Sequence, residues 1–489
     1  MKKFKIAFVS SEVVPFAKTG GLADVAGALP KALSELGHDV LVIMPKYGVI
    51  SEDKYRLNKV IERIDVQLGD WPMEGSVYEG RFPGTEIPVY FIDNKDFFNR
   101  QELYQVHGKD YEDNLERFTF FSKAVLETLK KLDTKPDIIH CNDWQTGLVP
   151  TYLKTIYSND PFLQDVKTVF TIHNIGYQGL FPKEKFHITG LGWDQFHYER
   201  LEFHGKLSLI KGGLVYSDVI TTVSKTYSRE IQTEEYGHGL DGLLRHRNED
   251  LYGVVNGIDY NVWNPMIDEH IPAKYGPDNL SGKGRCKKTL QRESGLAVKD
   301  VPLIGMITRL ASQKGLDLVQ EIMKDLVSMD VQFIILGTGE PVYHEFFKKT
   351  AGEYPKKISV TIGFDNALAH KIEAGSDIFL MPSKYEPCGL NQLYSLKYGT
   401  IPLVRKTGGL ADTIVNYTPS NLKAGKANGF VFKEYSSKAL LDTIKDTARL
   451  YPRNNLWHKL MLNGMKQDFS WHHSALEYEK LYRKAISCQ

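Results

Sequence analysis

The sequence has few cysteines and no long apolar run, and each absence excludes a class of protein. The four cysteines, Cys141, Cys286, Cys388 and Cys488, lie far apart and form no CxxC pair. This usage is typical of a reducing compartment and argues against a disulfide framework or a zinc ribbon. No stretch approaches about 18 uninterrupted apolar residues, so we expect no membrane span.

The chain also lacks an excess of charge of either sign, with 61 Lys and Arg against 60 Asp and Glu. Binding to nucleic acid or to an anionic membrane is therefore not indicated. The start, MKKFKIAFVSSE, places two lysines before an apolar run, as a secretion signal does. Lys5 interrupts that run, Glu12 closes it and no small-residue cleavage site follows. We interpret the run as a first buried strand, Lys5 to Val9, and expect a cytoplasmic protein.

The length of 489 residues and the apolar fraction of 42% are enough for two cores. Short β-branched runs alternate with amphipathic helical stretches, which predicts an α/β fold with two Rossmann-like, doubly wound parallel sheets. The runs are KIAFVSS, DVLVIMP, DIIHCND, TVFTIHN and DVITTVS, then PLIGMIT, QFIILGTG, ISVTIG, DIFLMPS and TIPLVR.

The pattern restarts near VNGIDYNVWNP, where Asn, Gly and Pro punctuate the chain. We therefore expect an N-terminal domain at residues 1–251 and a C-terminal domain at 252–469. Residues 470–489 are predicted to form a helix that packs back on the first domain. Two such sheets would present the carboxyl ends of their strands to a deep cleft between the domains, where ligands bind in these folds.

The heptapeptide KTGGLAD occurs twice, each time after an apolar strand and before a helical stretch. In the first copy, Lys18, Gly20 and Gly21 precede a helix expected from about Ala23. Glycines allow close approach of a ligand, and a helix start with a neighbouring lysine would neutralise a diphosphate without a metal. The spacing is neither GxGxxG nor a P-loop. A structural Gly-Gly turn is the alternative.

The second copy runs from Lys406 to Asp412. Either both copies face one anionic ligand, or two similarly built halves keep similar turns. We favour a mixture, in which Lys18 is functional and Lys406 has a structural or supporting role.

Polar residues follow two neighbouring strands of the first half. His173 and Asn174 come just after TVFTI, and Asp143 and Trp144 follow DIIHCN. A lone histidine is more often structural, but its place at a strand end favours a site. We expect Asp143 and Trp144 to be exposed to the same region, where an aromatic face suits a sugar ring.

Two cations follow a strand of the second half, Arg309 and Lys314 in TRLASQKGLDL. Their spacing across a loop would let two otherwise unpaired charges converge on one phosphate group, the alternative being a solvated charge pair.

A second candidate in this half is the block PSKYEPCGLNQLY. Glu386 stands just before a helix expected to start near Cys388, and could accept hydrogen bonds from sugar hydroxyls. The backbone N–H groups of the helix start would face the same ligand. They belong to Gly389, Leu390 and Asn391. A nucleophilic Cys388 is the less favoured interpretation, since no His neighbours it in sequence.

Together these motifs resemble those of bacterial glycogen synthases and plant starch synthases. The resemblance covers nearly the whole chain. It is carried by KTGGLADVAGALP, HNIGYQGLF, GLDGLL, VNGIDYNVWNP, TRLASQKGLDL and EPCGLNQLY. It implies the GT-B fold and transfer of glucose, with retention, from ADP-glucose to the non-reducing end of an α-1,4-glucan. It also implies that no metal or other cofactor is needed. Consistently, the sequence contains no Asp-x-Asp triplet, which metal-dependent sugar transferases typically use.

The resemblance assigns roles to the candidate residues. Lys18 and the two glycines would contact the donor phosphate and glucose, and Arg309 and Lys314 the diphosphate. His173 would hydrogen-bond near the C6 hydroxyl of the transferred glucose. Glu386 and residues 388–391 would hold its C3 and C4 hydroxyls. Further donor-side positions are Asp24, Asn174, Asn256 and Phe364, and the acceptor-side positions are Tyr104, Tyr111, Asp143 and Trp144.

Three positions depart from the family pattern. Phe364 stands where relatives commonly have a tyrosine near adenine, so the ring is kept without its hydroxyl. Asn391 stands where many bacterial relatives have threonine. Gln145 replaces a histidine that is common after the DW pair, which leaves the acceptor subsite less defined.

The sequence offers no clear nucleophile for a two-step mechanism. Glu386 has no acidic partner in its helix, and Tyr394 stands where other retaining GT-B families carry a second Glu. We therefore expect front-face transfer, with the leaving ADP stabilised by Lys18, Arg309 and Lys314. The alternatives are a UDP-glucose-dependent transferase, a sucrose- or trehalose-type synthase, and a non-catalytic glucan-binding protein. A non-catalytic protein would be expected to lose the cations that bind phosphate, yet Lys18, Arg309 and Lys314 are all present.

Overall fold

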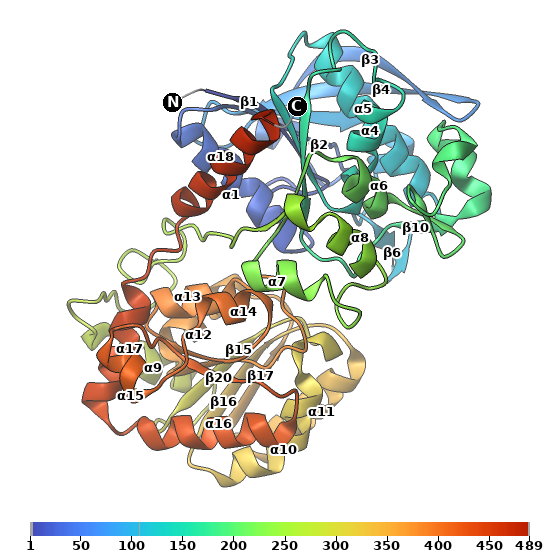
Figure 1. The fold of residues 1–489 in the computed structure, drawn as a ribbon. Helices are drawn as coiled ribbons and strands as arrows, with labels where there is room; N and C mark the ends of the chain where they lie inside the picture. The colour runs from blue at the N-terminus through green and yellow to red at the C-terminus, as the bar shows by residue number, and fades with distance from the viewer. Residues whose placement is uncertain (1–2, 107, 488–489) are drawn as a thin grey trace. The chain divides into compact units, whose positions relative to one another are not determined.

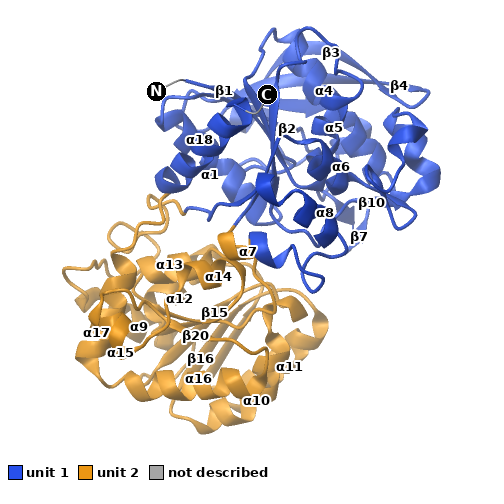
Figure 2. Ribbon diagram, in the orientation of Figure 1, with its two compact units in different colours: residues 1–223, 228–257, 471–489 blue, residues 224–227, 258–470 orange. Residues whose placement is uncertain are grey.

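The computed structural model describes residues 3–106 and 108–487, and the chain forms two compact units (Figures 1 and 2). Unit 1 comprises residues 1–223, 228–257 and 471–489, and unit 2 comprises residues 224–227 and 258–470. The chain therefore passes between the units after Val223, Tyr227, Gly257 and Ser470. The third passage lies within VNGIDYNVWNP, the segment that punctuates the sequence.

Unit 1 is built on a nine-stranded sheet with the order β14-β13-β9-β8-β1-β2-β5-β4-β3. The strands from β14 to β5 pair in parallel, as their buried, β-branched runs predict. They are β1 (Lys5–Val9), β2 (Asp39–Pro45), β5 (Pro88–Asp93), β8 (Ile138–Asn142), β9 (Lys167–Ile172), β13 (Val219–Thr222) and β14 (Leu251–Gly253). An antiparallel hairpin of β3 (Asn58–Leu68) and β4 (Trp71–Arg81) extends the sheet from β5.

Helices cover this sheet, and the last of them comes from the far end of the chain. The longer ones are α1 (Gly21–Glu35), α4 (Asn114–Lys131), α5 (Leu148–Lys154), α6 (Leu209–Tyr216) and α18 (Trp471–Ser487). α18 packs on α1 and on the sheet strands β9 and β13, and it buries a stripe of residues at helical spacing. The stripe consists of Trp471, Ala475, Tyr478, Tyr482 and Ala485.

The remaining elements of unit 1 are short and lie within the segments that connect the longer ones. They are α2 (Glu52–Tyr55), α3 (Lys95–Phe98), β6 (Gln105–Val106), β7 (Lys109–Asp110), β10 (Leu180–Pro182), β11 (Glu202–Phe203), β12 (Lys206–Ser208), α8 (Asp241–His246) and the 3₁₀ segments Trp144–Thr146, Lys183–Thr189, Trp193–Gln195 and Asn248–Asp250. α7 (Lys225–Glu230) begins in the short segment that groups with unit 2.

Unit 2 has a six-stranded, fully parallel sheet with the order β17-β16-β15-β18-β19-β20. Its strands are β15 (Leu303–Ile307), β16 (Gln332–Gly337), β17 (Ile358–Ile362), β18 (Ile378–Met381), β19 (Ile401–Arg405) and β20 (Phe430–Phe432). Its helices are α9 (Ser281–Glu293), α10 (Leu316–Ser328), α11 (Pro341–Glu353), α12 (Asn366–Gly375), α13 (Asn391–Lys397), α14 (Gly408–Thr413), α15 (Pro419–Lys423), α16 (Ser437–Leu450) and α17 (Asn454–Met465), with a 3₁₀ turn at Ser312–Lys314. The two predicted parallel-sheet α/β domains are confirmed.

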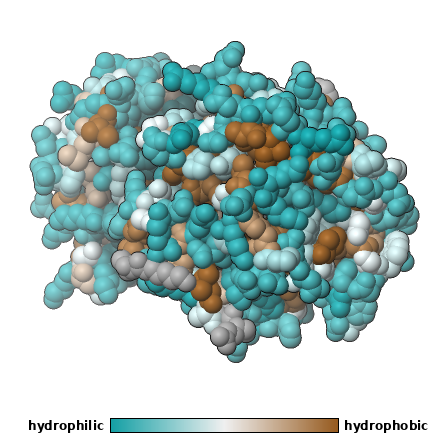
Figure 3. Space-filling view, turned by 90° about the horizontal axis from the view of Figure 1, so that it is seen from above, coloured by the Kyte–Doolittle hydropathy of each residue, from teal (hydrophilic) through white to brown (hydrophobic). Residues whose placement is uncertain are grey.

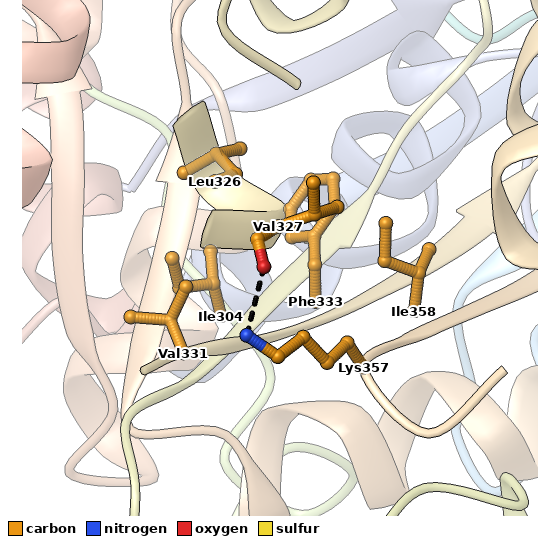
Figure 4. A pocket seen from close by; sticks show the side chains of 7 residues that line it. All are labelled: Ile304, Leu326, Val327, Val331, Phe333, Lys357 and Ile358. Atoms are coloured by element: carbon orange, nitrogen blue, oxygen red, sulfur yellow. Dashed lines mark hydrogen bonds between the residues drawn. The ribbon is translucent and has the colours of Figure 1, made fainter. Parts of the chain in front are cut away.

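A small apolar hollow of unit 2 lies at the amino ends of β15, β16 and β17, beside the end of α10 (Figure 4). The Lys357 side chain lines the hollow, and its Nζ donates to the carbonyl oxygens of Val327 (2.8 Å) and Met329 (2.7 Å). A cation on the last carbonyls of a helix satisfies groups that lack helical partners. This hollow therefore lies beside the end of α10, at the edge of the sheet opposite to the carboxyl ends of the strands.

Over the described residues, no helix is long and apolar enough to cross a membrane. Figure 3 shows one face of the molecule, on which apolar side chains occur in small separate groups among hydrophilic ones. That face therefore presents no broad apolar band.

Candidate functional site

The first KTGG loop follows β1, and a buried carboxylate that sequence reasoning missed holds its backbone. The Glu12 carboxylate accepts hydrogen bonds from the Thr19 hydroxyl (3.0 Å) and from the N–H groups of Thr19 and Gly20 (3.1 Å for Gly20). Burial raises the pKa of Glu12, and these bonds oppose that rise. The spacing Glu12–Thr19 gave no recognisable motif, so only the fold reveals it.

The two glycines of this loop face open space. A Cβ atom built on Gly20 or Gly21 would meet no other atom within 4 Å. Gly20 is extended, with φ −145°, so neither clash nor backbone strain requires glycine there. α1 begins at Gly21, slightly before the predicted start at Ala23. Glu12 thus fixes the backbone of the loop, and the space next to its two glycines, at the start of α1, holds no protein atoms.

Lys18 and Asp24 of the same heptapeptide pair with each other. The Lys18 Nζ lies 2.7 and 2.8 Å from the two Asp24 carboxylate oxygens, and both side chains are partly exposed. Asp24 therefore orients the lysine beside the open glycines. An exposed pair of this kind contributes little stability and exchanges partners readily.

His173 lies at the end of β9, and its surroundings define its tautomer. Its Nε2 is 2.9 Å from the Asn142 Oδ1, and the Asn142 amide nitrogen donates to the Val9 carbonyl oxygen at 3.0 Å. Because that amide nitrogen is the donor, the Asn142 oxygen accepts and His173 Nε2 carries the hydrogen. Burial lowers the pKa of His173 to about 3. The ring is therefore neutral and offers Nδ1 as an acceptor.

Asp143 is not exposed as predicted, and that expectation is wrong. Only 9% of its surface is accessible, and its carboxylate accepts the His173 N–H at 2.7 Å. Burial raises the pKa of Asp143 to about 7, against the effect of the backbone N–H groups of His173 and Asn174. Its φ of 54° lies in the left-handed region, which residues other than glycine rarely adopt. Asp143 thus supports the His173 loop.

Trp144 is half-buried, and its ring packs against other residues of unit 1. It packs edge-on against Phe118, with centroids 5.0 Å apart, and lies near Phe181 at 6.0 Å. Gly179 presses against the ring so closely that a Cβ there would come within 2.5 Å. The predicted exposure of this ring is therefore only partly met.

The other predicted residues of unit 1 have local partners. The Tyr104 hydroxyl is 2.7 Å from the Ser11 hydroxyl, and Tyr111 lies under the guanidinium groups of Arg100 and Arg117. The Asn174 Oδ1 accepts the Gly176 N–H at 3.0 Å and closes a turn. Asn256 is buried, and its Oδ1 has no hydrogen-bond partner among the described residues.

In unit 2, Arg309 and Lys314 both follow β15, but they differ in exposure. Arg309 is exposed, and its Nη2 donates to the Gln313 Oε1 at 3.1 Å. The Lys314 Nζ lies 2.6 Å from the Glu386 Oε2, which also accepts the Ser383 hydroxyl at 3.0 Å. Lys314 is therefore a paired cation, contrary to expectation. Glu386, only 6% exposed, ties the cation to the loop after β18.

The helix after Glu386 starts later than predicted. α13 begins at Asn391, and Gly389, two residues earlier, has a φ of 70° in the left-handed region. Cys388 is buried, with only 5% of its surface accessible. The Asn391 Nδ2 donates to the Ile307 carbonyl oxygen at 2.6 Å and joins α13 to the end of β15. Leu390, which precedes α13, is half-buried.

Phe364 follows β17 at the same edge of the sheet and is 86% exposed. Such exposure of an aromatic ring leaves both faces available for stacking. In the described part of the chain, no group of three or more His, Cys, Asp or Glu residues is placed to hold a metal ion.

Comparisons with known proteins agree along the whole chain. Residues 5–246 match the starch synthase catalytic domain, and residues 287–459 match glycosyl transferases group 1. A glycogen synthase of Desulforudis audaxviator is 50% identical over 99% of this chain and 97% of the relative. A glycogen synthase of Thermosipho melanesiensis is 49% identical over 99% of each.

Solved structures show the same relationship. The catalytic domain of starch synthase IV from Arabidopsis thaliana, bound to ADP and acarbose, aligns with a TM-score of 0.91 and 33% identity, covering 99% of this chain and 100% of that one. Sucrose-phosphate synthase from Thermosynechococcus elongatus shares the fold, with a TM-score of 0.60 at 16% identity and full coverage of both chains. The chain belongs to the glycogen synthase family of GT-B glucosyltransferases.

Proposed function

We propose that the chain transfers glucose from ADP-glucose to the non-reducing end of an α-1,4-glucan, with retention, and releases ADP. The observation that carries the proposal is the first KTGG loop, whose glycines have no structural need of being glycines and face open space at the start of α1. A diphosphate fits such a place, because N–H groups and the helix dipole favour negative charge there. ADP is the nucleotide named with the starch synthase structure.

The cations would then neutralise the leaving group. Lys18 beside the open glycines, and Arg309 and Lys314 after β15, are the groups we assign to the diphosphate. Lys314 is already held by Glu386 at 2.6 Å, so its charge is placed before a ligand arrives. Preorganised charge of this kind stabilises a developing anion without reorganisation cost. We propose that no metal takes part.

The transferred glucose would be recognised by hydroxyl contacts. With Nε2–H directed at Asn142, His173 offers Nδ1 as an acceptor for the C6 hydroxyl. Glu386 and the backbone of residues 388–391 are assigned to the C3 and C4 hydroxyls. These contacts orient the anomeric carbon and would account for much of the rate enhancement.

The proposed reaction is a front-face transfer. The bond between the anomeric carbon and the β-phosphate oxygen breaks, and a bond forms from the glucan O4 to the same face of that carbon. The O4 proton passes to the departing phosphate oxygen. Glu386 is engaged by Lys314 and Ser383, which suits a role in holding the sugar and not one as nucleophile.

The test is ADP release on glycogen, measured as initial rates with ADP-glucose and with UDP-glucose. We expect turnover with ADP-glucose that exceeds turnover with UDP-glucose, and an α-configured product by NMR. A preference for UDP-glucose would replace the proposed donor. Glycogen binding without release of either nucleotide would instead indicate a glucan-binding protein.

A further inference from the structure

The second KTGGLAD segment has an environment opposite to that of the first. Gly408 and Gly409 start α14 in unit 2, and a Cβ on either would collide with backbone. On Gly408 it would lie 1.9 Å from the Glu386 carbonyl oxygen, and on Gly409 2.1 Å from the Cys388 carbonyl oxygen. The space that is open above the first glycine pair is here filled by the loop that carries Glu386.

Gly409 also holds that loop by hydrogen bonds. The Gly409 N–H donates to the carbonyl oxygens of Glu386 (3.1 Å) and Pro387 (3.2 Å). Gly408 adopts a φ of 43°, a left-handed conformation that favours glycine. The start of α14 therefore requires glycine on grounds of both space and backbone.

Residues 224–227 form a second set of hydrogen bonds, one with the loop that carries Glu386 and two with α14. The Ser224 hydroxyl, fully buried, donates to the Pro387 carbonyl oxygen at 2.6 Å and accepts the Tyr227 N–H at 3.1 Å. The Asp412 carboxylate, the last residue of the heptapeptide, accepts from the Thr226 N–H (2.8 Å) and hydroxyl (2.6 Å). In the first copy the equivalent aspartate pairs with Lys18 instead.

Gln392 of α13 is the third group that hydrogen-bonds the backbone of this loop. Its amide nitrogen donates to the carbonyl oxygens of Cys388 and Gly389, both at 3.0 Å, and contacts the Thr413 hydroxyl of α14 at 3.4 Å. The backbone of the loop from Glu386 to Gly389 is thus fixed by α14, by Ser224 and by Gln392. The carboxylate of Glu386 is fixed separately by Lys314 and Ser383.

We infer that the second KTGGLAD segment, together with Ser224 and Thr226, positions the Glu386–Gly389 loop against the C4 hydroxyl of the transferred glucose. Gly408, Gly409, Asp412 and Ser224 are positioning residues in this scheme, since each acts through the loop. The inference rests on the proposed function for the contact between this loop and the sugar. It explains why one heptapeptide occurs twice, with a ligand expected over one copy and a protein loop over the other.

The experiment is steady-state kinetics of Ser224→Ala with ADP-glucose and with its 4-deoxyglucose analogue, on glycogen. We expect kcat with ADP-glucose to fall about tenfold, and kcat with the 4-deoxy donor to change less than about twofold, because the mispositioned contact is absent from that donor. Thr226→Val should show a smaller defect of the same kind, and Thr226→Ser, which keeps the hydroxyl, should restore turnover.

Ser436→Ala is the matched control. Like Ser224, Ser436 accepts an N–H at the start of a helix, from Ala439 at 3.3 Å. The helix it caps is α16, and not one that contacts the Glu386–Gly389 loop in the scheme above. Ser436→Ala should lower thermal stability as Ser224→Ala does and leave kcat unchanged. An equal defect of Ser224→Ala on both donors, or wild-type kcat on ADP-glucose, overturns the inference. Failure of the proposed function would show earlier, as absence of ADP release by the wild-type protein.

Glycine substitutions give an independent arm. Gly409→Ala should reduce turnover far more than Gly352→Ala, since a Cβ at Gly352 in α11 meets nothing within 4 Å. Wild-type kcat in a folded Gly409→Ala protein would contradict the positioning role. If Gly409→Ala does not fold, the Ser224 comparison still decides.

Discussion

At the scale of single residues, His173 has a defined protonation state. Burial lowers its pKa from the ordinary 6.5 to about 3, so we expect a neutral ring at neutral pH, with Nδ1 as an acceptor. We expect no inflection from His173 in the dependence of kcat on pH between about 5 and 8. NMR titration of the ring checks this, and a midpoint near 6.5 would refute the assignment.

Removal of the same ring should be costly. His173→Ala is expected to lower kcat about 10- to 100-fold, the loss of one hydrogen bond to a sugar hydroxyl. His187→Ala is the control, because His187 is exposed and lies on another segment of unit 1. Equal activity of the two variants would remove His173 from the site.

The two cations after β15 can be tested against a lysine elsewhere in unit 2 that forms an ion pair like that of Lys314. Lys314→Ala and Arg309→Ala should each reduce turnover about 10²-fold, because a preorganised charge on the leaving diphosphate is lost. Lys371→Ala also breaks a lysine–glutamate pair of unit 2, with Glu293 at 2.8 Å, and should leave turnover unchanged. Initial rates of ADP release measure all three. Near-normal rates in both site variants would reject the phosphate assignment.

At the scale of elements, the first KTGG loop separates the demands of folding from those of binding. Gly21→Ala places a methyl group where no protein atom lies within 4 Å and improves the helix propensity of the first turn of α1. We therefore expect an unchanged or higher Tm together with a KM for ADP-glucose raised about tenfold or more, through a clash with the donor. Differential scanning calorimetry and initial rates test both parts. A lowered Tm with normal KM would show that the glycine is structural.

The elements also show what sequence can predict. The parallel strands were predictable because each is a short buried run with its own hydrophobic signal, as in KIAFV and QFIILG. Glu12, Asn142 and Ser224 were not, because their partners lie 7 to 163 residues away and no local spacing encodes those contacts. Asp143 was misplaced for a related reason. A polar residue after a strand is expected outside, whereas the Asp143 carboxylate is buried and accepts the N–H of His173, 30 residues away.

At the scale of the whole molecule, the last helix joins the sheet of unit 1. The buried His140 at the centre of that sheet bonds through Nδ1 to the Tyr482 hydroxyl of α18 (2.8 Å) and through Nε2 to the Thr171 hydroxyl (2.6 Å). Burial, with a smaller contribution from His173, lowers the pKa of His140 to about 3. The neutral ring is thus part of the contact, here called the seam, between α18 and the sheet of unit 1.

This seam predicts both a mutational and a pH effect on the free energy of unfolding. Tyr482→Phe leaves His140 Nδ1 without its partner and should cost about 1–3 kcal/mol, whereas Tyr198→Phe, at an exposed tyrosine of the same unit, should cost almost nothing. Because the folded pKa of His140 is depressed, its contribution is complete above about pH 6.5. It is lost as the pH falls toward 3, since the unfolded chain binds the proton first. Urea unfolding at pH 7 and pH 5 measures both effects. Equal stabilities of the two tyrosine variants would show that α18 is held by apolar packing alone.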